Sequence, residues 1–583
     1  MRRTTPRFTP PASGRPYALS LLLTAILAAC GTSPQTPGAP QASGPSVILQ
    51  PLTIDPGAFN TLSYETPESA SNGWGPYETN KSNGGQAAGD GNTLTLNGAT
   101  YPVGLGVHAN SSLVYNVGAQ CNSFTAQIGV DDEVGSNGSV VFQVFVDGVK
   151  RFDSGTMTGS STTQSVNVDI RGAEKLKLVV TDAGNGIDYD HADWADAKLR
   201  DCIAYSGPLT ITTGGTYSGN WRSLEPGVAA VRIQTTQPVV IENATIAGRA
   251  HLIASAVDNV NVTVRNSRAY GLNPHPTIGG HFKGRFLNAY KPANVVLENN
   301  YLQGTKGILI NDDRSLPAPS ITIRYNRVKN VDGRASDGAG GYRSGSINGT
   351  DFDWSQFVQL DKVKNAPNVE IAWNEVINEP YHSRVEDNIN IYLSSGTAAG
   401  PIRIHNNYIQ GAYHARPELD GASPQYSGGG ILLSDANATL AEDVPGFVHA
   451  YHNQVVSTGN YGLAIASGHD NLIENNRVVS SGRLPDGTTN LSADYSNGIY
   501  VWNPDGQPST HFYNNIARNN AAGLWRFRDG QWQGSPYWLP HCAADLCTGN
   551  VGLGSPADYA GEQAELQRWK DKLVQNNVRV GPQ

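Results

Sequence analysis

The sequence predicts an all-β protein in which an antiparallel β-sandwich is followed by a right-handed parallel β-helix. Gly (65) and Pro (34) are abundant and Met (2) is rare, which is typical of a turn-rich β chain. Residues 57–203 show period-two alternation broken by Asp-Gly and Asn-Gly turns. Residues 207–553 repeat a short Asn-containing phrase, which indicates a stack of similar coils.

Length and charge limit the classes of function. A chain of 583 residues has room for several domains, or for one module beside a long repeat array. Lys and Arg number 41 against 50 Asp and Glu, so the formal net charge is −9. Nucleic-acid binding by counterion release needs a basic surface, so we expect no nucleic-acid partner.

The N-terminus has the pattern of an export signal. Arginines precede an apolar run at 21–29 that is too short to span a bilayer as a mature helix. Leu27-Ala-Ala-Cys30-Gly31 resembles the bacterial lipobox, and this resemblance implies that Cys30 is acylated and becomes the mature N-terminus. We therefore interpret residues 1–30 as a lipoprotein signal peptide and residues 31–56 as a Pro/Gly/Ser-rich tether. The expected location is extracytoplasmic and lipid-anchored to a bacterial membrane; the alternative is an ordinary signal with an incidental Cys.

The other four cysteines suit an oxidising compartment. Their even number predicts two disulfides, Cys121 with Cys202 and Cys542 with Cys547. A zinc site at the second pair is disfavoured, because Cys542-Ala-Ala-Asp-Leu-Cys547 lacks a CxxC-like spacing, although His541 adjoins it.

Residues 57–203 alternate apolar and polar side chains, as in Ser139–Val146 and Lys175–Val180, which predicts an antiparallel sandwich. A series of motifs within this range resembles the NPCBM family, whose members are galactose-binding-like β-sandwiches noticed as carbohydrate-binding modules on family 98 glycosyl hydrolases. The motifs, in chain order, are Trp74, Gly104–His108, Phe124–Glu133, Phe142–Gly148, Asp153–Gly155 and Asp188–Asp196. The resemblance implies that this part of the chain binds a carbohydrate.

Five residues of this sandwich are candidates for sugar binding. Trp74 and Trp194 are able to stack on the apolar face of a sugar ring, while Asp190, His191 and Asp193 are able to hydrogen-bond hydroxyls or ligate calcium. Calcium is the one cofactor considered, and no cofactor is required by the sequence. The alternative interpretation is that Asp190–Trp194 is a buried corner that orders the final strand.

The repeated phrase has an apolar residue, two variable residues, Asn, one residue and another apolar residue. It occurs at Leu297–Leu302, Ile323–Val328, Ile371–Val376, Ile404–Ile409 and Ile473–Val478, with looser copies around Asn453 and Asn515. Second apolar strands follow at Gly307–Ile310, Phe357–Leu360, Asn388–Ile391, Gly430–Leu433, Gly462–Ile465 and Gly498–Val501. Strands of this kind, with an Asn ladder at one bend, predict the β-helix of pectate-lyase-like proteins. Gln563–Leu573 is amphipathic at helical spacing, and residues 554–583 are expected to form a helical cap on the last coil.

Chemistry is expected on the outward face of the second strand. Asn311, Asp361, Tyr392 and Ser434 should line up, with Gln359, Asn390 and Leu432 beside them. Near this row we single out a set of candidate catalytic residues, with Arg384–Asp387 as the densest cluster: Asp361, Lys362, Arg384, Glu386 and Asp387.

Three interpretations of these residues stay open. Inverting hydrolysis needs carboxyl groups ~6.5 to 9.5 Å apart, and coils that stack at ~4.8 Å could place Asp361 and Asp387 or Glu386 at that separation. Elimination from a uronate needs a cation and a basic Lys362 or Arg384, with acidic neighbours that hold calcium. In the third interpretation the charges are merely solvated.

We therefore expect a carbohydrate-binding protein whose β-helix binds and cleaves a polysaccharide, as a glycoside hydrolase or a polysaccharide lyase. The alternative is a non-catalytic envelope or adhesion protein that uses the β-helix as a spacer. The expected partners are a glycan and, through the N-terminal lipid, a membrane, and the expected state is a monomer.

Overall fold

The computed structural model describes residues 59–583 except 314–317, 346–349, 419–427, 436–437, 439–442, 493–496, 544 and 555–558. The predicted signal peptide, Cys30 and the predicted tether lie outside the described residues. Within the described part of the chain, no helix combines the length and the apolar character that crossing a bilayer requires.

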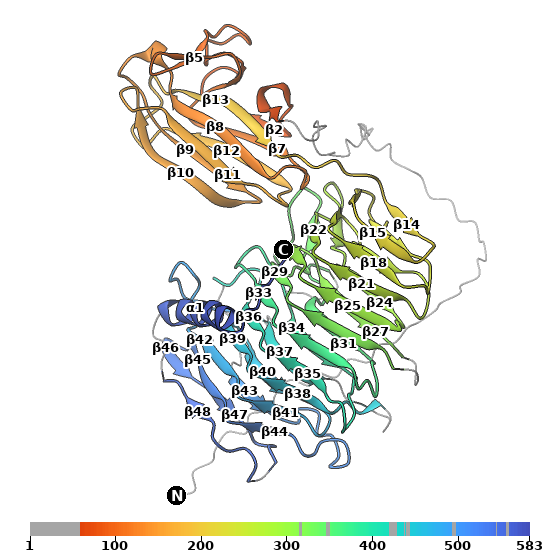
Figure 1. Cartoon of the computed structure of the whole chain (residues 1–583). Helices are drawn as coiled ribbons and strands as arrows, with labels where there is room; N and C mark the ends of the chain where they lie inside the picture. Colours follow the sequence, from red (N-terminus) through yellow and green to blue (C-terminus); the bar gives the residue numbers. More distant parts are fainter. Residues whose placement is uncertain are drawn as a thin grey trace, which may run out of the picture. The chain divides into compact units, whose positions relative to one another are not determined.

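The first folded part is an antiparallel β-sandwich, coloured red to yellow in Figure 1. One sheet contains, in order, β11 (Gln164–Asp169), β8 (Ser123–Val130), β13 (His191–Arg200), β6 (Gly104–His108) and β3 (Glu78–Thr79), with β1 (Asn60–Thr61) on β13. The other contains β10 (Val149–Thr158), β9 (Ser139–Val146), β12 (Lys175–Thr181), β7 (Ser111–Asn116) and β2 (Ser69–Ser71). A hairpin of β4 (Leu94–Leu96) and β5 (Ala99–Tyr101) and the 3-10 turns η1 (Leu62–Tyr64) and η2 (Asp132–Val134) complete it.

Buried and exposed side chains alternate along the strands of this sandwich, as predicted. Every second residue of β9 is buried, including Val140, Phe142 and Val144, because successive side chains of a strand point to opposite faces. The predicted Cys121–Cys202 disulfide is confirmed and joins the start of β8 to the end of β13. A crosslink that closes a loop of this length is worth ~3 to 5 kcal/mol, largely through the unfolded state.

The second folded part is a parallel β-helix built from three long sheets. Sheet I contains β14 (Leu209–Ile211), β17 (Val231–Ile233), β20 (Ile253–Ser255), β24 (Leu287–Tyr290), β27 (Gly307–Asn311), β31 (Gln356–Asp361), β34 (Asp387–Tyr392), β37 (Gly429–Asp435), β40 (Tyr461–Ile465), β43 (Asn497–Val501) and β47 (Tyr537–Trp538). All of its neighbouring strands are parallel. Six of the apolar strands predicted from the sequence fall in β27, β31, β34, β37, β40 and β43.

Sheets II and III supply the other two sides of each coil. Sheet II contains β15 (Gly215–Tyr217), β18 (Val239–Glu242), β21 (Asn261–Arg265), β25 (Asn294–Glu298), β28 (Ser320–Arg324), β32 (Val369–Ala372), β35 (Ile402–His405), β38 (Val448–Tyr451), β41 (Leu472–Glu474) and β44 (Ile516–Arg518). Sheet III contains β16 (Asn220–Ser223), β19 (Thr245–Gly248), β22 (Arg268–Gly271), β26 (Tyr301–Gln303), β29 (Arg327–Lys329), β33 (Glu375–Ile377), β36 (Tyr408–Ala412), β39 (Gln454–Thr458), β42 (Arg477–Ser480), β45 (Ala521–Arg528) and β46 (Gln531–Gly534), with β48 (Val551–Gly552) on β45. A separate antiparallel pair is β23 (Gly279–Phe282) with β30 (Ala335–Asp337).

The interior of the β-helix is a continuous stack of aliphatic side chains. In sheet I, one inward row is fully buried from coil to coil: Ile308, Val358, Ile389, Ile431, Leu463 and Ile499. Like residues thus lie one above another in the core, and the packing of each coil depends on its neighbours.

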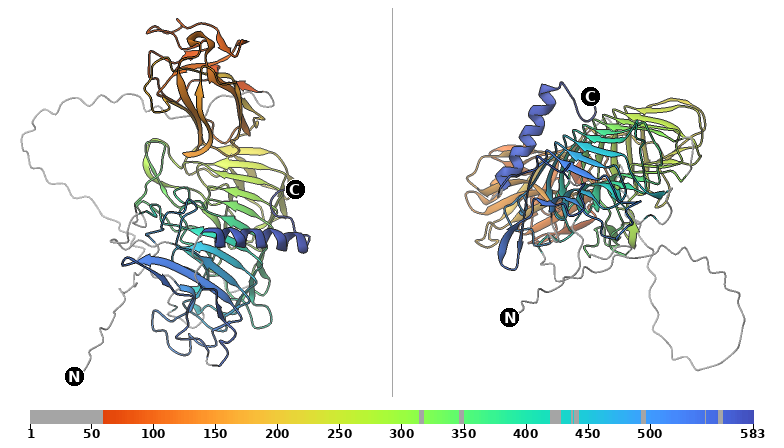
Figure 2. Two further views of the ribbon diagram at one scale, coloured as in Figure 1. Left: turned by 90° about the vertical axis from the view of Figure 1, so that its left-hand side faces the viewer. Right: turned by 90° about the horizontal axis from the view of Figure 1, so that it is seen from below.

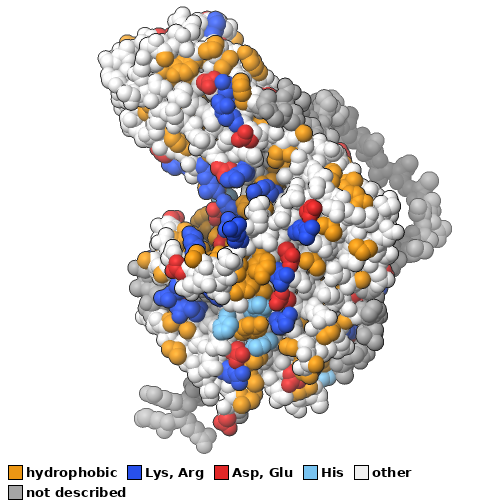
Figure 3. All heavy atoms as spheres, viewed as in Figure 1, with side chains coloured by type: hydrophobic (Ala, Val, Ile, Leu, Met, Phe, Trp, Pro, Cys, Tyr) orange, Lys and Arg blue, Asp and Glu red, His pale blue; other side chains and the backbone are white. Residues whose placement is uncertain are grey.

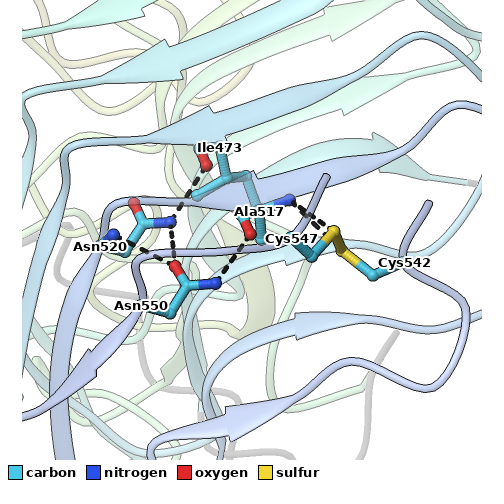
Figure 4. Close-up of a disulfide and its surroundings, with 6 residues drawn as sticks. All are labelled: Ile473, Ala517, Asn520, Cys542, Cys547 and Asn550. Atoms are coloured by element: carbon cyan, nitrogen blue, oxygen red, sulfur yellow. Dashed lines mark hydrogen bonds between the residues drawn. A yellow bond between two sulfur atoms is a disulfide. The ribbon is translucent and has the colours of Figure 1, made fainter. Parts of the chain in front are cut away.

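The predicted Asn ladder is present at the bend between sheets II and III. Each buried Asn donates its Nδ2 to Oδ1 of the Asn one coil further on, at 2.9–3.1 Å, from Asn300 to Asn550. Figure 4 shows the end of the ladder, where Asn520 donates to Asn550 and Asn550 donates to the carbonyl of Ala517. The second predicted disulfide, Cys542–Cys547, is confirmed and lies beside Ala517.

One predicted member of the ladder is wrong. Asn515 does not continue it; Asn515 instead accepts from Asn471 in a second, shorter ladder, and Asn520 takes the expected place. Both asparagines precede an apolar residue pair, so the loose phrase could not distinguish the two bends.

The C-terminal helix also differs from the expectation. Helix α1 (Tyr559–Gln575) lies against the side of the stack rather than over its end, as both views of Figure 2 show. Its buried Trp569 donates to Glu375 of β33 at 2.9 Å, and its Glu565 accepts from Arg477 of β42. The outward aromatic side chains Trp373 and Tyr408 pack against Trp569, so the apolar stripe of the helix covers sheet III and does not cap the last coil.

Candidate functional site

Sheet I presents two outward rows along the β-helix, and the parallel register defines both. Gln359, Asn390 and Leu432 occupy equivalent positions on successive strands, as predicted. Asn311, Asp361 and Tyr392 form the next row, also as predicted. Ser434 does not continue that row, because an irregularity between Asn390 and Tyr392 pairs Tyr392 with Asp435; Ser434 is instead fully buried.

This shift brings a carboxyl group that sequence reasoning missed into an acidic cluster, which comprises Glu386, Asp387 and Asp435. Asp387 is 2% exposed, and its Oδ1 accepts from the hydroxyl of Tyr461 while its Oδ2 accepts from Asn390 Nδ2 at 3.2 Å. The same Asn390 nitrogen donates to Asp435 Oδ2 at 3.1 Å. The cluster therefore spans two adjacent coils, because Asp387 lies on β34 and Asp435 on β37.

Glu386 has a strongly raised pKa. Burial raises the pKa of Glu386 well above its usual range, and the charges of Asp387 and Asp435 raise it further. A hydrogen bond from Gln356 Nε2 and the positive charge of Arg285 oppose this rise. At neutral pH Glu386 is thus poised to hold a proton beside Asp387 and Asp435.

Asp361, which Lys362 follows, lies at the far end of β31 from Asp387 and Glu386, in the row that continues through Tyr392 to Asp435. The register of β31 with β34 places Gln356 opposite Asp387. Asp361 follows Gln356 by five positions, and five residues of extended strand span ~16 Å. Asp361 accepts from Asn311 at 2.5 Å, and burial raises its pKa. The expectation that Asp361 pairs with Asp387 or Glu386 across one coil is therefore wrong, since it treated the two ends of the strand as one site.

Arg384 lies in the interior of the protein. Its side chain is fully buried, lies over the ring of Phe352 at 4.4 Å and donates to the carbonyl of Tyr413 at 3.3 Å. A guanidinium held in this way has no access to the C5 proton of a bound uronate. The proposed role of Arg384 as a base is therefore corrected to one of packing and hydrogen bonding.

The candidate sugar site of the sandwich divides into exposed and buried members. Trp74 is 49% exposed, and Asn72 binds its carbonyl at 2.8 Å while accepting from the backbone of His108 at 2.7 Å. His191 is half-buried and its Nδ1 lies 2.7 Å from Glu133 Oε1. Trp74 and His191 therefore remain suitable for contact with a ligand.

Trp194, Asp190 and Asp193 are in the interior instead. Trp194 is 0% exposed and packs against Phe124 and Phe142, so it cannot stack on a sugar. Asp190 accepts from the backbone of Ser139 at 2.7 Å, and Asp193 is buried beside Asp131. Burial, and then the charge of Asp131, raises the pKa of Asp193 well above its usual range. These three residues correspond to the buried corner that was the alternative interpretation.

Glu133 is the polar centre that the sequence reasoning overlooked. Its Oε2 accepts from Asn92 at 2.9 Å and from Ser82 at 3.1 Å. Burial would raise its pKa, but the hydrogen bonds from His191 and Asn92 outweigh burial and lower it. Glu133 was visible only as part of the Phe124–Glu133 motif, because its partners are distant in sequence.

The described residues do not form a cluster of side chains suited to a metal ion. No group of three or more His, Cys, Asp or Glu side chains there is placed to hold a metal ion. Asp190 and Asp193 do not form the calcium site considered from the sequence.

These observations define a class: an all-β protein with an antiparallel sandwich that exposes an aromatic and polar surface, and a parallel β-helix that carries clustered carboxyl groups. Comparison with known proteins is more specific for the sandwich. Residues 60–200 match the model of the NPCBM/NEW2 domain, so this part of the chain is an NPCBM/NEW2 domain.

Individual relatives show the same division. Over 184 residues (31% of this chain), the protein is 43% identical to a Renibacterium salmoninarum protein named "Putative endo-alpha-N-acetylgalactosaminidase", of which it spans 12%. A CBM51 structure from Clostridium perfringens, solved with methyl-galactose, is 41% identical, with 24% of this chain and 100% of that chain covered and a TM-score of 0.23. The catalytic domain of a GH87 alpha-1,3-glucanase is 10% identical, with 84% and 97% covered and a TM-score of 0.34.

Proposed function

We propose that this protein is an extracytoplasmic glycoside hydrolase that holds a polysaccharide through its sandwich and cleaves it at the acidic cluster of the β-helix. The observation that carries the proposal is the pairing of a carboxyl with a raised pKa, Glu386, with carboxylates on two adjacent coils, Asp387 and Asp435. Glycosidases use such a pair of carboxyl groups in opposite protonation states.

The roles follow from exposure and contacts. Glu386 donates its proton to the glycosidic oxygen as the bond to the leaving sugar breaks. Asp435 is less buried than Asp387, and we assign it the attack at the anomeric carbon or the activation of water. Asp387 is enclosed by Tyr461 and Asn390 and stabilises positive charge that develops on the sugar ring.

Elimination is less well supported than hydrolysis. It requires a base next to a group that neutralises the uronate, and Arg384 is buried whereas Lys362 follows Asp361 at the far end of β31. The residues that the lyase interpretation needs are therefore not brought together.

Carbohydrate binding by residues 60–200 is supported by the NPCBM/NEW2 match, by the exposed Trp74 and by the polar pair His191 and Glu133. The Renibacterium relative is named for action on N-acetylgalactosamine, so glycans that contain sugars of the galactose type are the first ligands to test. Anchoring through an acylated Cys30 is a further part of the proposal, supported by the lipobox-like sequence alone.

The test is a panel of polysaccharides incubated with the protein, with parallel assays for new reducing ends and for ultraviolet-absorbing unsaturated products. Hydrolysis should give reducing ends without the unsaturated product, and Glu386→Gln should abolish it. Unsaturated products would favour a lyase, and no product from any glycan that the protein binds would favour the non-catalytic spacer.

A further inference from the structure

Asn390 occupies the centre of the acidic cluster. It lies on β34 and is 2% exposed. Its Nδ2 is 3.2 Å from Asp387 Oδ2 on the same strand and 3.1 Å from Asp435 Oδ2 on β37. One amide nitrogen thus contacts carboxylates that belong to two different coils.

The chemistry of an amide matches this position. The NH₂ group carries two hydrogens and can donate one to each carboxylate, whereas ionised carboxylates only accept. Two oxygens that bind one nitrogen at these distances are at most about 6 Å apart, so their negative charges repel strongly at a site with little water. The donated hydrogens offset this repulsion and favour the ionised forms.

The orientation of the amide is determined by the same contacts. If Oδ1 occupied the place of Nδ2, three acceptors would face one another without a hydrogen. In the arrangement observed, Oδ1 is buried and has no hydrogen-bond partner among the described residues. A side chain that leaves its own acceptor unsatisfied in order to donate twice incurs a cost in stability, which indicates a role other than folding.

We propose that Asn390 is a positioning residue that holds Asp387 and Asp435 together as ionised carboxylates at a fixed separation, and this proposal rests on the proposed hydrolase function. The hydroxyl of Tyr461 also donates to Asp387. Asn390 donates to both carboxylates and so links the two coils of the site.

The pair of variants Asn390→Ala and Asn390→Asp separates this role from simple packing. Asn390→Ala removes both donors, so protonation of Asp387 and Asp435 becomes easier and the acidic limb of the kcat profile should move up by at least one pH unit. kcat should fall by at least 100-fold while KM changes less than threefold. Asn390→Asp adds a fourth carboxyl group to the acidic cluster and should be more severe than Asn390→Ala.

Two further variants provide the comparison. Tyr461→Phe removes the hydroxyl that donates to Asp387 but keeps both donors of Asn390, so its acidic limb should move less than that of Asn390→Ala. Asn388→Ala is the matched structural control, because Asn388 lies on the same strand and donates to the carbonyls of Gly411 and Gly429. It should lower the melting temperature equally at pH 4 and pH 7 and leave the pH profile unchanged.

A readout without turnover keeps the two proposals distinguishable. Because Asn390 favours ionised carboxylates, the loss of melting temperature in Asn390→Ala should be larger at pH 7 than at pH 4. That result in a protein that cleaves no glycan would retain the positioning role and reject the hydrolase. An equal loss at both pH values, or a reduced kcat with an unmoved acidic limb, would overturn the positioning role of Asn390.

Discussion

Carboxyl groups on the same face of the β-helix have different expected roles because their surroundings differ. Asp361 and Glu386 are both carboxyl groups near the outward face of sheet I, but the charges of Asp387 and Asp435 act on Glu386, whereas those of Lys362 and Asp313 act on Asp361. The outward row of Asn311, Asp361 and Tyr392 was predictable, because side chains along a strand alternate between inward and outward. The ends of the row were not, because a single irregularity between β34 and β37 replaces Ser434 by Asp435.

The two tryptophans of the sandwich should respond to mutation in opposite ways. Trp74→Ala should weaken binding of a glycan that contains galactose-type sugars, with little change in melting temperature, because the ring is half exposed. Trp194→Ala should instead cost ~3 to 5 kcal/mol of unfolding free energy, because it opens a cavity beside Phe124 and Phe142.

Isothermal titration and thermal melting of both variants check this expectation. The sequence alone assigned the two tryptophans the same role, since burial depends on strand pairings that a single sequence does not display. Glycan binding retained by Trp74→Ala would place the ligand elsewhere on the sandwich.

At the level of elements, the repeat was the most predictable feature. The Asn phrase and the apolar strand after it recur in coil after coil, and both follow from backbone geometry. The looser copies of the phrase did not predict the ladder correctly where two bends of the chain carry Asn, as at Asn515 and Asn520. The position of α1 was predicted wrongly, because amphipathicity identifies an apolar stripe on a helix but not the surface that this stripe covers.

The ladder should contribute to stability and not to binding. In Asn374→Ala, the donor to Asn407 and the acceptor for Asn326 are both lost in a buried setting. Each unsatisfied buried group costs ~1 to 3 kcal/mol, so chemical denaturation should show a clear loss of unfolding free energy. Unchanged stability would mean that neighbouring coils relax to satisfy the exposed groups.

Docking of α1 should depend on pH through Glu562. This side chain is 1% exposed, accepts from the backbone and hydroxyl of Ser481 at 2.7 Å, and burial raises its pKa to about 7. Between the ordinary pKa of a glutamate and about 7, the unfolded form is ionised while the folded form keeps its proton. Stability therefore falls as pH rises through this window.

Glu562→Gln removes this titration while retaining an acceptor for Ser481. The melting temperature of the variant should exceed that of the parent protein at pH 8 and match it more closely at pH 5. If the difference between the two proteins is the same at both pH values, Glu562 does not couple protonation to folding.

At the level of the whole molecule, the two folded parts suit different tasks on one polymer. The sandwich offers an exposed aromatic residue near hydrogen-bonding groups, and the β-helix offers carboxyl groups on a rigid sheet. In the view of Figure 3, acidic and basic side chains lie next to one another along the β-helix.

Membrane attachment is expected to depend on one residue. Acylation supplies two or three chains, which is enough for stable anchoring where a single chain is marginal. Cys30→Ala should therefore move the protein from the membrane fraction to the soluble fraction of the producing cell. Retention in the membrane fraction would reject the lipobox interpretation of the N-terminus.

The most direct measurement of the central claim is glycan turnover by the parent protein, Glu386→Gln and Asp361→Asn. If Glu386 is the proton donor, Glu386→Gln should lose ~10² to 10⁴ in kcat with its melting temperature retained. Asp361→Asn should lose far less than Glu386→Gln, because Asp361 lies ~16 Å along the strand from the position that faces Asp387 and two strands away from Asp435. Full activity in Glu386→Gln, or equal loss in both variants, would contradict the assignment of catalysis to the acidic cluster.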